Sequence, residues 1–358
     1  MGEPELVELL QGLDSVPERC GVTVVACVRD EEAYLEDAAR SVLDQDYDGH
    51  LLLVLAVGPS HDATARIAAR LAAEDDRVVV VDNPTGSRSV GLNLAIDHLG
   101  TDVDHPVVLR VDGHTELPPQ YVRRCIDLLR STGAVGVGGL MAPVGRGAVQ
   151  EAAARAMSHP AGIGAASFHT GGVAGPAETV YLGAFRRAAV DAVGGYDPTL
   201  FRAEDWDLCL RLRRAGGVLW FDPSLVVEYR PRRTLRAVAK QFWRTGMWRR
   251  EVVRRDPSTA GLRYLAPPVL VAGLVVSAVL VGVGLVATLP GVAAVGAALP
   301  AAYLVGVLLA ATHASVRAPR LSVAAALVLP VVLVTMHVCW GSGFVRGLTA
   351  RAAVDHRA

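Results

Sequence analysis

Cysteine is scarce and scattered in this sequence, and charge of one sign is not in excess. The spacing of the five cysteines argues against a zinc site or a disulfide framework and suits a reducing cytosol. The 35 basic and 36 acidic residues give a net charge of −1, so no overall positive field favours nucleic acid, and we expect no nucleic acid partner. The cysteines are Cys20, Cys27, Cys125, Cys209 and Cys339.

Charged residues are almost missing from positions 265 to 344, where Arg317 and Arg320 are the exceptions. Three apolar stretches occupy this region, at 265–289, 291–312 and 321–340. Each has about 20 residues or more, which is enough to cross a hydrocarbon core of roughly 30 Å. We therefore expect a membrane domain at 259–358 with about three spans.

The first fifteen residues are acidic and lack the apolar run of an export signal, so we expect the N-terminal domain to stay in the cytoplasm. The basic cluster before the first span predicts the same orientation, and Arg317 and Arg320 agree with it. The basic tail does not agree with three full crossings. The last segment is therefore either re-entrant or kinked at Pro330, and the arginines of the tail are Arg346, Arg351 and Arg357.

Residues 230–258 form a basic and aromatic region. From 230 to 255 there are ten arginines or lysines and one acidic residue, Glu251, interleaved with Phe242, Trp243 and Trp248. This composition is typical of a helix that lies on anionic lipid. The alternative is a solvated basic face, which would leave these large apolar side chains exposed.

The first 229 residues alternate short apolar runs with helical patterns. Such alternation predicts an α/β domain with a mainly parallel sheet and helices on both faces, in which ligands bind beyond the carboxyl ends of the strands. A looser, glycine-rich region follows at 133–175, and two short strands are expected around Asp222. Strands are expected at 22–28, 51–57, 78–81 and 107–111, and helices at 31–43, 62–73, 87–99 and 204–215.

Asp112 and His114 follow the fourth expected strand, within the motif RVDGH. A carboxylate and an imidazole two residues apart in a loop can face one divalent cation, and the cation would neutralise the diphosphate of a leaving nucleotide. The alternative is that both residues simply form a turn. The position after a buried strand favours the metal site.

Glu204 and Asp205 open the expected helix at 204–215, within the motif AEDWD. Attack by a sugar hydroxyl requires a general base, and a carboxylate at a helix start is held rigidly. The alternative is an N-cap with acidic residues in the first turn.

Gln241 and Arg244 lie in the basic region near Trp248, in the sequence QFWRTGMW. Arginine and tryptophan together suit a diphosphate and a stacked sugar or lipid head. Anchoring at the membrane interface is an equal alternative for this segment taken alone.

The order of these motifs resembles glycosyltransferase family 2, most closely the branch that builds succinoglycan-type bacterial exopolysaccharides. The similarity extends from about residue 22 to residue 250, and the apolar C-terminal stretches fit the usual layout of this branch. The motifs that carry it are RDEE at 29–32, SVLDQDY at 41–47, RVDGH, GAFRR at 183–187, VGGYDPTL, AEDWDLCLRLRRAG and QFWRTGMW.

The resemblance implies a GT-A fold and direct inversion at the anomeric carbon. It implies that Asp205 is the catalytic base, that Glu204 and Trp206 contact the acceptor, and that Asp112 and His114 hold Mn²⁺ or Mg²⁺. It also implies a set of donor-binding residues, which are Arg88, Asn93, Asp112, Gln241, Arg244 and Trp248.

Three positions depart from the family pattern. Val57 stands where family members usually have an aspartate that grips the nucleobase, although Asp62 and Thr64 remain and are able to cap the next helix. His114 replaces an aspartate in the metal motif. Thr245 stands where the QxxRW element has tryptophan, and Trp248 is the candidate substitute.

The sequence thus predicts an inverting, metal-dependent, hexosyltransferase-like enzyme in the cell membrane, with its catalytic domain in the cytoplasm. It would move a sugar from a nucleotide-sugar to a lipid-linked saccharide in exopolysaccharide or cell-envelope glycan synthesis. Other polysaccharide-assembly proteins are candidate partners. One alternative is a polyprenyl-phosphate sugar synthase, although a lipid phosphate would need a base such as Asp205 less. Another is a non-catalytic membrane scaffold of an assembly complex that has lost donor binding. Val57 in place of the base-binding aspartate supports this alternative, and the retained Asp112, Asp205 and Arg244 argue against it.

Overall fold

The computed structural model describes residues 3–98, 104–164, 166–200 and 202–347. The chain divides into two compact units. The first comprises Met1–Ala142 and Gly171–Glu228, and the second comprises Pro143–Thr170 and Tyr229–Ala358. The second unit therefore includes a segment that the sequence analysis assigned to the catalytic domain.

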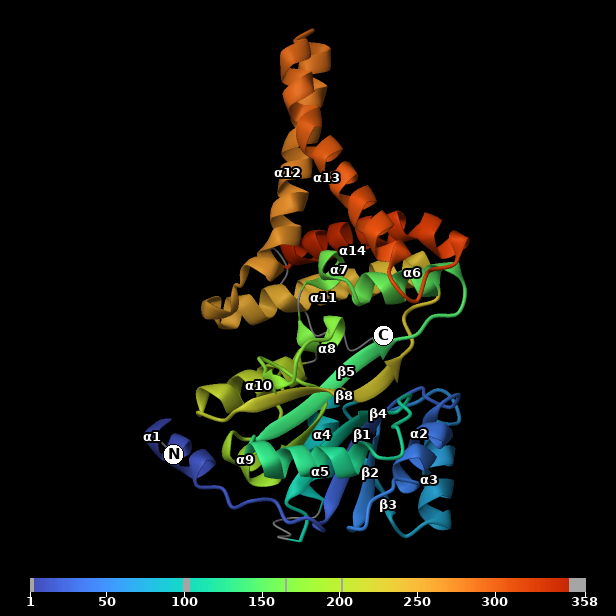
Figure 1. Cartoon of the computed structure of the whole chain (residues 1–358), viewed down its shortest axis with the longest axis vertical. Coiled ribbons are helices and arrows are strands. Elements are labelled where there is room, and N and C mark those ends of the chain that lie inside the picture. Colours follow the sequence, from blue (N-terminus) through green and yellow to red (C-terminus); the bar gives the residue numbers. More distant parts are fainter. Residues whose placement is uncertain (1–2, 99–103, 165, 201, 348–358) are drawn as a thin grey trace. The chain divides into compact units, whose positions relative to one another are not determined.

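The first unit is built on a mixed sheet with the strand order β3-β2-β1-β4-β7-β5-β8-β6 (Figure 1). Strands β1 to β4 are parallel, as predicted, and β7 runs antiparallel to both β4 and β5. The strands are β1 Val22–Val28, β2 Leu51–Val57, β3 Val78–Asp82, β4 Val107–Asp112, β5 Gly136–Pro143, β6 Gly175–Pro176, β7 Tyr181–Arg186 and β8 Leu219–Tyr229.

Helices cover both faces of this sheet. One face packs against α2, α3 and α5, and the other against α4, α9 and α10. The bounds are α1 Glu3–Gln11, α2 Leu35–Leu43, α3 Thr64–Glu74, α4 Arg88–Asp97, α5 Tyr121–Thr132, α9 Arg187–Ala192 and α10 Glu204–Arg214.

The continuous apolar runs of the parallel strands arise because both faces are buried. In β2, Leu53 and Leu55 point to the layer of α2, α3 and α5, whereas Val54 and Ala56 point to the layer of α4 and α10. Alternation along a strand thus assigns each position of β4 to one layer or the other. In β4 this alternation determines which side chains face α4 and α10, the helices that border the candidate site.

Three sequence predictions about the first two thirds of the chain need correction. The region expected to be loose, 133–175, contains β5 and the short helices α6 (Ala148–Met157), α7 (Pro160–Ile163) and α8 (Ser167–Thr170). The two strands expected around Asp222 are one continuous strand, β8. The helix expected at 31–43 begins only at Leu35, and Leu99, the expected end of another helix, lies outside the described residues.

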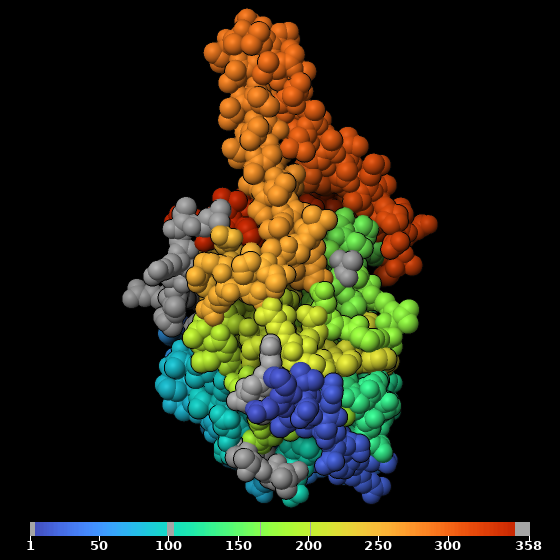
Figure 2. All heavy atoms as spheres, turned by 90° about the vertical axis from the view of Figure 1, so that its left-hand side faces the viewer, coloured from blue at the N-terminus to red at the C-terminus, as the bar shows by residue number. Residues whose placement is uncertain are grey.

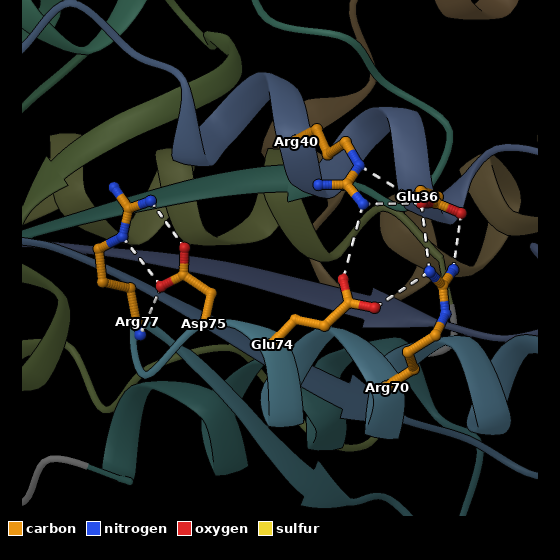
Figure 3. Close-up of polar contacts among 6 residues, drawn as sticks. All are labelled: Glu36, Arg40, Arg70, Glu74, Asp75 and Arg77. Carbon is orange, nitrogen blue, oxygen red and sulfur yellow. Dashed lines mark hydrogen bonds and ion pairs between the residues drawn. The ribbon is translucent and has the colours of Figure 1, made fainter.

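A network of ion pairs joins the exposed sides of α2 and α3 (Figure 3). Glu36 lies 2.7 Å from Arg70 and 2.9 Å from Arg40, and Arg70 also pairs with Glu74 at 3.3 Å. These contacts lower the pKa of Glu36 to about 2, with the hydrogen bond from Arg70 as the largest cause. The network ties two helices of one layer together.

The second unit is helical. Beyond α6, α7 and α8 it contains α11 (Leu235–Arg255), the 3₁₀ turn η1 (Pro257–Thr259), α12 (Leu262–Val286), α13 (Pro290–Val316) and α14 (Val323–Arg346). Helices α12, α13 and α14 are long and apolar enough to cross a membrane, which confirms the predicted C-terminal apolar helices.

Helices α12 and α13 form a hairpin whose outer surface is apolar. The space-filling view shows the paired helices as a narrow column near the tip of the hairpin (Figure 2). Large aliphatic side chains along both helices face outward, among them Val276 (57% exposed) and Leu309 (67% exposed). An exposed apolar surface of this extent is typical of contact with lipid.

Helix α14 lies alongside α11 and crosswise to the hairpin (Figure 1). Glycines allow the two backbones to approach closely, because a Cβ on Gly246 or Gly343 would collide with the backbone of the other helix. Phe242 of α11 is buried, with its ring 6.3 Å from that of Trp340. Phe242 thus packs inside the unit and is not available to contact lipid, and the interfacial position of α11 stays a prediction.

Candidate functional site

Strand β4 brings two charged residues to one face of the sheet. Val107, Leu109 and Val111 point into the layer of α2, α3 and α5. Arg110 and Asp112 alternate with them and therefore face α4 and α10. An arginine in an otherwise apolar buried strand is expected to pair with acidic groups, because an unpaired buried charge is strongly unfavourable.

Arg110 finds its partners in three carboxylates. Its Nη2 donates to Asp112 at 2.8 Å and lies 3.7 Å from Glu204, while its Nη1 contacts Asp205. The Arg110 side chain is only 5% exposed, so water screens these pairs little. One guanidinium thus joins the end of β4 to the first turn of α10.

Arg110 and Asp112 favour each other's ionised forms. Burial alone would raise the pKa of Asp112, but Arg110, Arg88 and His114 together lower it to about 2. Burial opposes the charge on Arg110 as well, yet Asp112 and Glu204 raise the pKa of that guanidinium above its ordinary value. A permanently ionised carboxylate at this edge of the sheet is suited to hold a cation.

The start of α10 presents Asp205 while it buries Glu204. Glu204 is 3% exposed and pairs with Arg88 at 3.3 Å, whereas the Asp205 side chain is 36% exposed. The N-cap position is Ala203, which has a left-handed φ of 64° and makes no side-chain cap. The interpretation of Asp205 as an N-cap is therefore wrong, although its place in the first turn lets the helix dipole favour its negative charge.

His114 lies in the loop after β4 and contacts the loop after β1. Its Nδ1 lies 2.8 Å from Glu31, and this hydrogen bond is the largest cause that raises the pKa of His114. The loop after β1 is itself fixed, because the Glu31 amide donates to Thr64 at 2.7 Å and the Glu32 amide donates to Asp62 at 3.0 Å. Asp62 also accepts the Thr64 amide at 2.9 Å, but the N-cap of α3 is Ala63, which makes no side-chain cap, so neither Asp62 nor Thr64 is the N-cap.

The described residues contain no cluster of three or more His, Cys, Asp or Glu side chains that could hold a metal ion by itself. Mg²⁺ and similar ions are commonly bound by one or two carboxylates, with phosphate oxygens of the substrate and water completing the shell. The ionised Asp112 fits that pattern. A metal here would therefore depend on the donor for part of its ligands.

Comparison with known proteins decides the family. Residues 17–247 match the family described as "Glycosyltransferase like family 2", which is more than half of the chain. The chain belongs to glycosyltransferase family 2. It is also 31% identical over 277 residues, covering 77% of this chain and 83% of the relative, to the succinoglycan biosynthesis protein ExoA of Rhizobium meliloti (strain 1021).

Solved structures agree with the GT-A fold of this glycosyltransferase. The mannosyltransferase PcManGT from Pyrobaculum calidifontis, in complex with GDP-Man and Mn²⁺, is similar with a TM-score of 0.55 at 17% identity, over 97% of this chain and 93% of that one. TarS 1-349 of S. aureus in complex with UDP has a TM-score of 0.45 at 13% identity. That match covers 64% of this chain and 65% of TarS 1-349.

In this glycosyltransferase, the residues of α4 that were expected to approach the nucleotide have different surroundings. Arg88 opens the helix, its side chain is 47% exposed, and it pairs with Glu204. Asn93 is fully engaged, because its Nδ2 donates to the Tyr196 carbonyl at 2.7 Å and its Oδ1 accepts the Tyr196 amide at 2.8 Å. Asn93 thus fixes the turn at 195–196, and its contact with the donor stays a prediction.

The remaining predicted donor residues lie on α11, in the second unit. The Gln241 side chain donates to the Tyr229 hydroxyl at 3.3 Å, and Arg244 and Trp248 are partly buried. Their approach to the donor stays a prediction, as do the acceptor contacts of Glu204 and Trp206. The burial of Glu204 beneath two arginines favours a supporting role for it.

The motif analysis missed two residues of this glycosyltransferase's site. Arg110 was part of a quoted motif but received no role, although a charge inside the apolar run VVLRV was a visible signal. Glu31 was also quoted, within RDEE. Its contact with His114 joins residues 83 positions apart, and nothing in the local sequence specifies such a contact.

Proposed function

We propose that the chain is an inverting, metal-dependent glycosyltransferase that moves a sugar from a nucleotide-sugar to a lipid-linked saccharide at the cytoplasmic face of the membrane. The observation that carries this proposal is Asp205, a partly exposed carboxylate at a helix start that one buried arginine links to Asp112. Arg110 thus holds the proposed base close to the edge of the sheet where the diphosphate would bind. This arrangement suits sugar transfer from a nucleotide-sugar. The similarity to ExoA supports a place in exopolysaccharide or cell-envelope glycan synthesis.

In the proposed reaction, Asp205 accepts the proton of the acceptor hydroxyl. The hydroxyl oxygen then forms a bond to the anomeric carbon on the face opposite the nucleotide, and the bond from that carbon to the diphosphate oxygen breaks. The electron pair leaves with the nucleoside diphosphate, so the configuration at the anomeric carbon inverts. Bound divalent metal would neutralise the diphosphate, with Asp112 and His114 as its proposed protein ligands.

Arg110 has a positioning role in this scheme. Its planar guanidinium carries several donors in a fixed fork, so it can hold two carboxylates in a defined relation. It keeps Asp205 next to the edge of the sheet where Asp112 ends β4. The spacing of the base relative to the diphosphate site would then depend on a residue that touches neither substrate.

For the membrane, we propose two crossings by the hairpin of α12 and α13, with α14 lying at the cytoplasmic interface. Helix α11 carries arginines over its whole length, and charge at the centre of a bilayer is expensive. Helix α14 packs along α11, and at its ends Ser322 donates to Glu151 at 2.8 Å and Gly347 lies against Arg250. Both ends of α14 therefore lie beside charged residues of helices from the same unit.

The burial of α14 supports the same topology. In its most apolar stretch 28% of the residues are buried, against 11% in α12 and in α13. Two crossings return the chain to the side from which it entered, and the basic tail then lies on the cytoplasmic side. This arrangement removes the conflict between the tail arginines and the positive-inside rule.

The proposed function is tested by a donor screen on membranes that contain the full chain. Common nucleotide-sugars are supplied one at a time with Mn²⁺, and both nucleoside diphosphate release and sugar in the lipid extract are measured. We expect one donor to give both products. Release of nucleotide with labelled sugar on a bare lipid phosphate would instead support a polyprenyl-phosphate sugar synthase, and no turnover with any donor would contradict the proposal.

A further inference from the structure

The second unit contains a cavity of about 420 Å³ at the foot of the α12–α13 hairpin. It lies among the short helix α7, the first turns of α12, the middle of α13 and the C-terminal half of α14. Its volume falls within the range of about 300–1,000 Å³ that small-molecule sites occupy. The lining residues important here are Arg263, Pro267, Leu270, Tyr303, His337 and Trp340.

Polar groups converge on this cavity although most of its wall is apolar. His337 lies between two partners: its Nε2 is 2.6 Å from the Ala161 carbonyl and its Nδ1 is 3.0 Å from the Tyr303 hydroxyl. The carbonyl can only accept, so Nε2 carries a proton, and in the neutral imidazole Nδ1 then accepts from the tyrosine. An imidazole and a hydroxyl thus join α7, α13 and α14 at the wall of the cavity.

One cationic donor belongs to the same wall. Arg263, in the first turn of α12, lines the cavity and places a guanidinium at the level where the hairpin would enter the bilayer. The guanidinium contacts the Tyr264 hydroxyl and lies 4.5 Å from the centre of the Tyr264 ring. A guanidinium carries five N–H donors, so donors remain for an anionic ligand.

We propose that this cavity binds the anionic phosphate end and the first apolar segment of the lipid that carries the acceptor saccharide. Arg263 would donate to the phosphate oxygens, and arginine suits a phosphate because its donors form a planar fork. Pro267, Leu270 and Met336 would pack on the hydrocarbon. The identity of the lipid rests on the proposed function, whereas the location of its binding site rests on the cavity.

Neighbouring residues on α12 provide a matched pair of variants. Leu270 lines the cavity, whereas Val269 is 68% exposed on the outer side of the hairpin. Leu270→Trp should fill the cavity, and Val269→Trp adds the same side chain to the lipid-facing surface. Both variants leave the predicted donor residues and Asp205 unchanged.

The probe is a diazirine-bearing farnesyl monophosphate, photolysed with the full chain in lipid nanodiscs. We expect labelling of peptides from α7, the start of α12 or the turn around Trp340, competed by farnesyl phosphate but not by farnesol or inorganic phosphate. Leu270→Trp should lose most of this labelling, and Val269→Trp should keep it.

Labelling outside these segments, or equal labelling of the Leu270→Trp and Val269→Trp proteins, would overturn the cavity assignment. Competition by farnesol as effective as that by farnesyl phosphate would overturn the role of the phosphate. The donor screen is independent of both results. Sugar transfer without cavity labelling refutes this inference alone, and cavity labelling without turnover of any donor refutes the proposed function alone.

Discussion

Arg110 and Asp205 form an ion pair between the carboxyl-terminal half of strand β4 and the first turn of helix α10, across 95 residues of sequence. The arginine is buried and the carboxylate is partly exposed, so one side of Asp205 is held by the protein while the other side faces solvent. The same guanidinium holds Asp112 at 2.8 Å. The geometry of the proposed base and of the proposed metal ligand is therefore set by one shared residue.

Replacement of Arg110 should affect transfer more than folding. Arg110→Lys keeps a positive charge but loses the planar fork, so Asp112 and Asp205 cannot both be held. We expect a loss of stability of about 1.5–3 kcal/mol, as for a hydrogen bond to a charged group, with a large fall in kcat. Thermal unfolding and kcat are measured on the same preparation.

The control for Arg110 is Arg186, which is also buried. Within the part of the chain that the structure describes, Arg186 donates only to backbone carbonyls, including those of Ala134 and Asp14. Arg186→Lys should destabilise the protein and leave kcat of the folded fraction near that of the wild type. If both lysine variants lose kcat to the same extent, the positioning role of Arg110 is wrong.

Removal of divalent metal should abolish transfer. EDTA would strip the ion proposed at Asp112, and Mn²⁺ or Mg²⁺ should restore activity. Asp112→Asn should raise the metal concentration needed for half-maximal transfer, and His114→Ala should do so with little effect on unfolding because its side chain is exposed. Full activity in EDTA would exclude the metal assignment.

The parallel core of the fold was predictable, and the site was predictable only in part. Strands β1 and β2 have the predicted bounds, because buried parallel strands are continuous apolar runs. Segment 133–175 was not predictable, since its glycines weaken local propensity while packing still stabilises β5 and α6. The motifs selected Asp112 and Asp205 as candidates, and their roles stay predictions. Their link through Arg110 depends on strand alternation and on the position of α10, which only tertiary structure shows.

The ion-pair network of Glu36 should produce a pH-dependent contribution to stability. Contacts with Arg70 and Arg40 lower the pKa of Glu36 from 4.5 to about 2, so the folded protein binds this proton more weakly than the unfolded chain. The stabilisation is complete above the ordinary pKa and disappears as pH falls from about 4.5 towards 2. Glu36→Gln should therefore lower Tm at neutral pH, with a difference that narrows in acid and in high salt.

Asp37 provides the control for this measurement. It is exposed on the same helix, and the described part of the chain shows no ion pair for it. Asp37→Asn should leave Tm nearly unchanged at every pH. A Glu36→Gln difference that stays constant between neutral and acidic pH would show that the network does not stabilise the fold.

The two-crossing topology predicts that the tip of the hairpin and the C-terminus lie on opposite sides of the membrane. Thr288 lies at the tip, between α12 and α13. In a background with Cys27 and Cys339 replaced by serine, Thr288→Cys should react with an impermeant maleimide applied from outside the cell. A tag after residue 358 should be reached only in inside-out vesicles, and access to both from outside would instead support three crossings.

The most direct test of the account is the activity of Asp205→Asn, because Asp205 is the proposed base. Asparagine preserves the size of the side chain but cannot accept the acceptor's proton, so transfer should fall by about 10²–10⁴-fold while the Kd of the donor changes little. Asp207 is the control, since it lies on the same helix and pairs with Arg211 at 2.7 Å. We predict that Asp207→Asn keeps transfer near the wild-type rate, whereas wild-type transfer by Asp205→Asn, with donor binding intact, would contradict the assignment of the base.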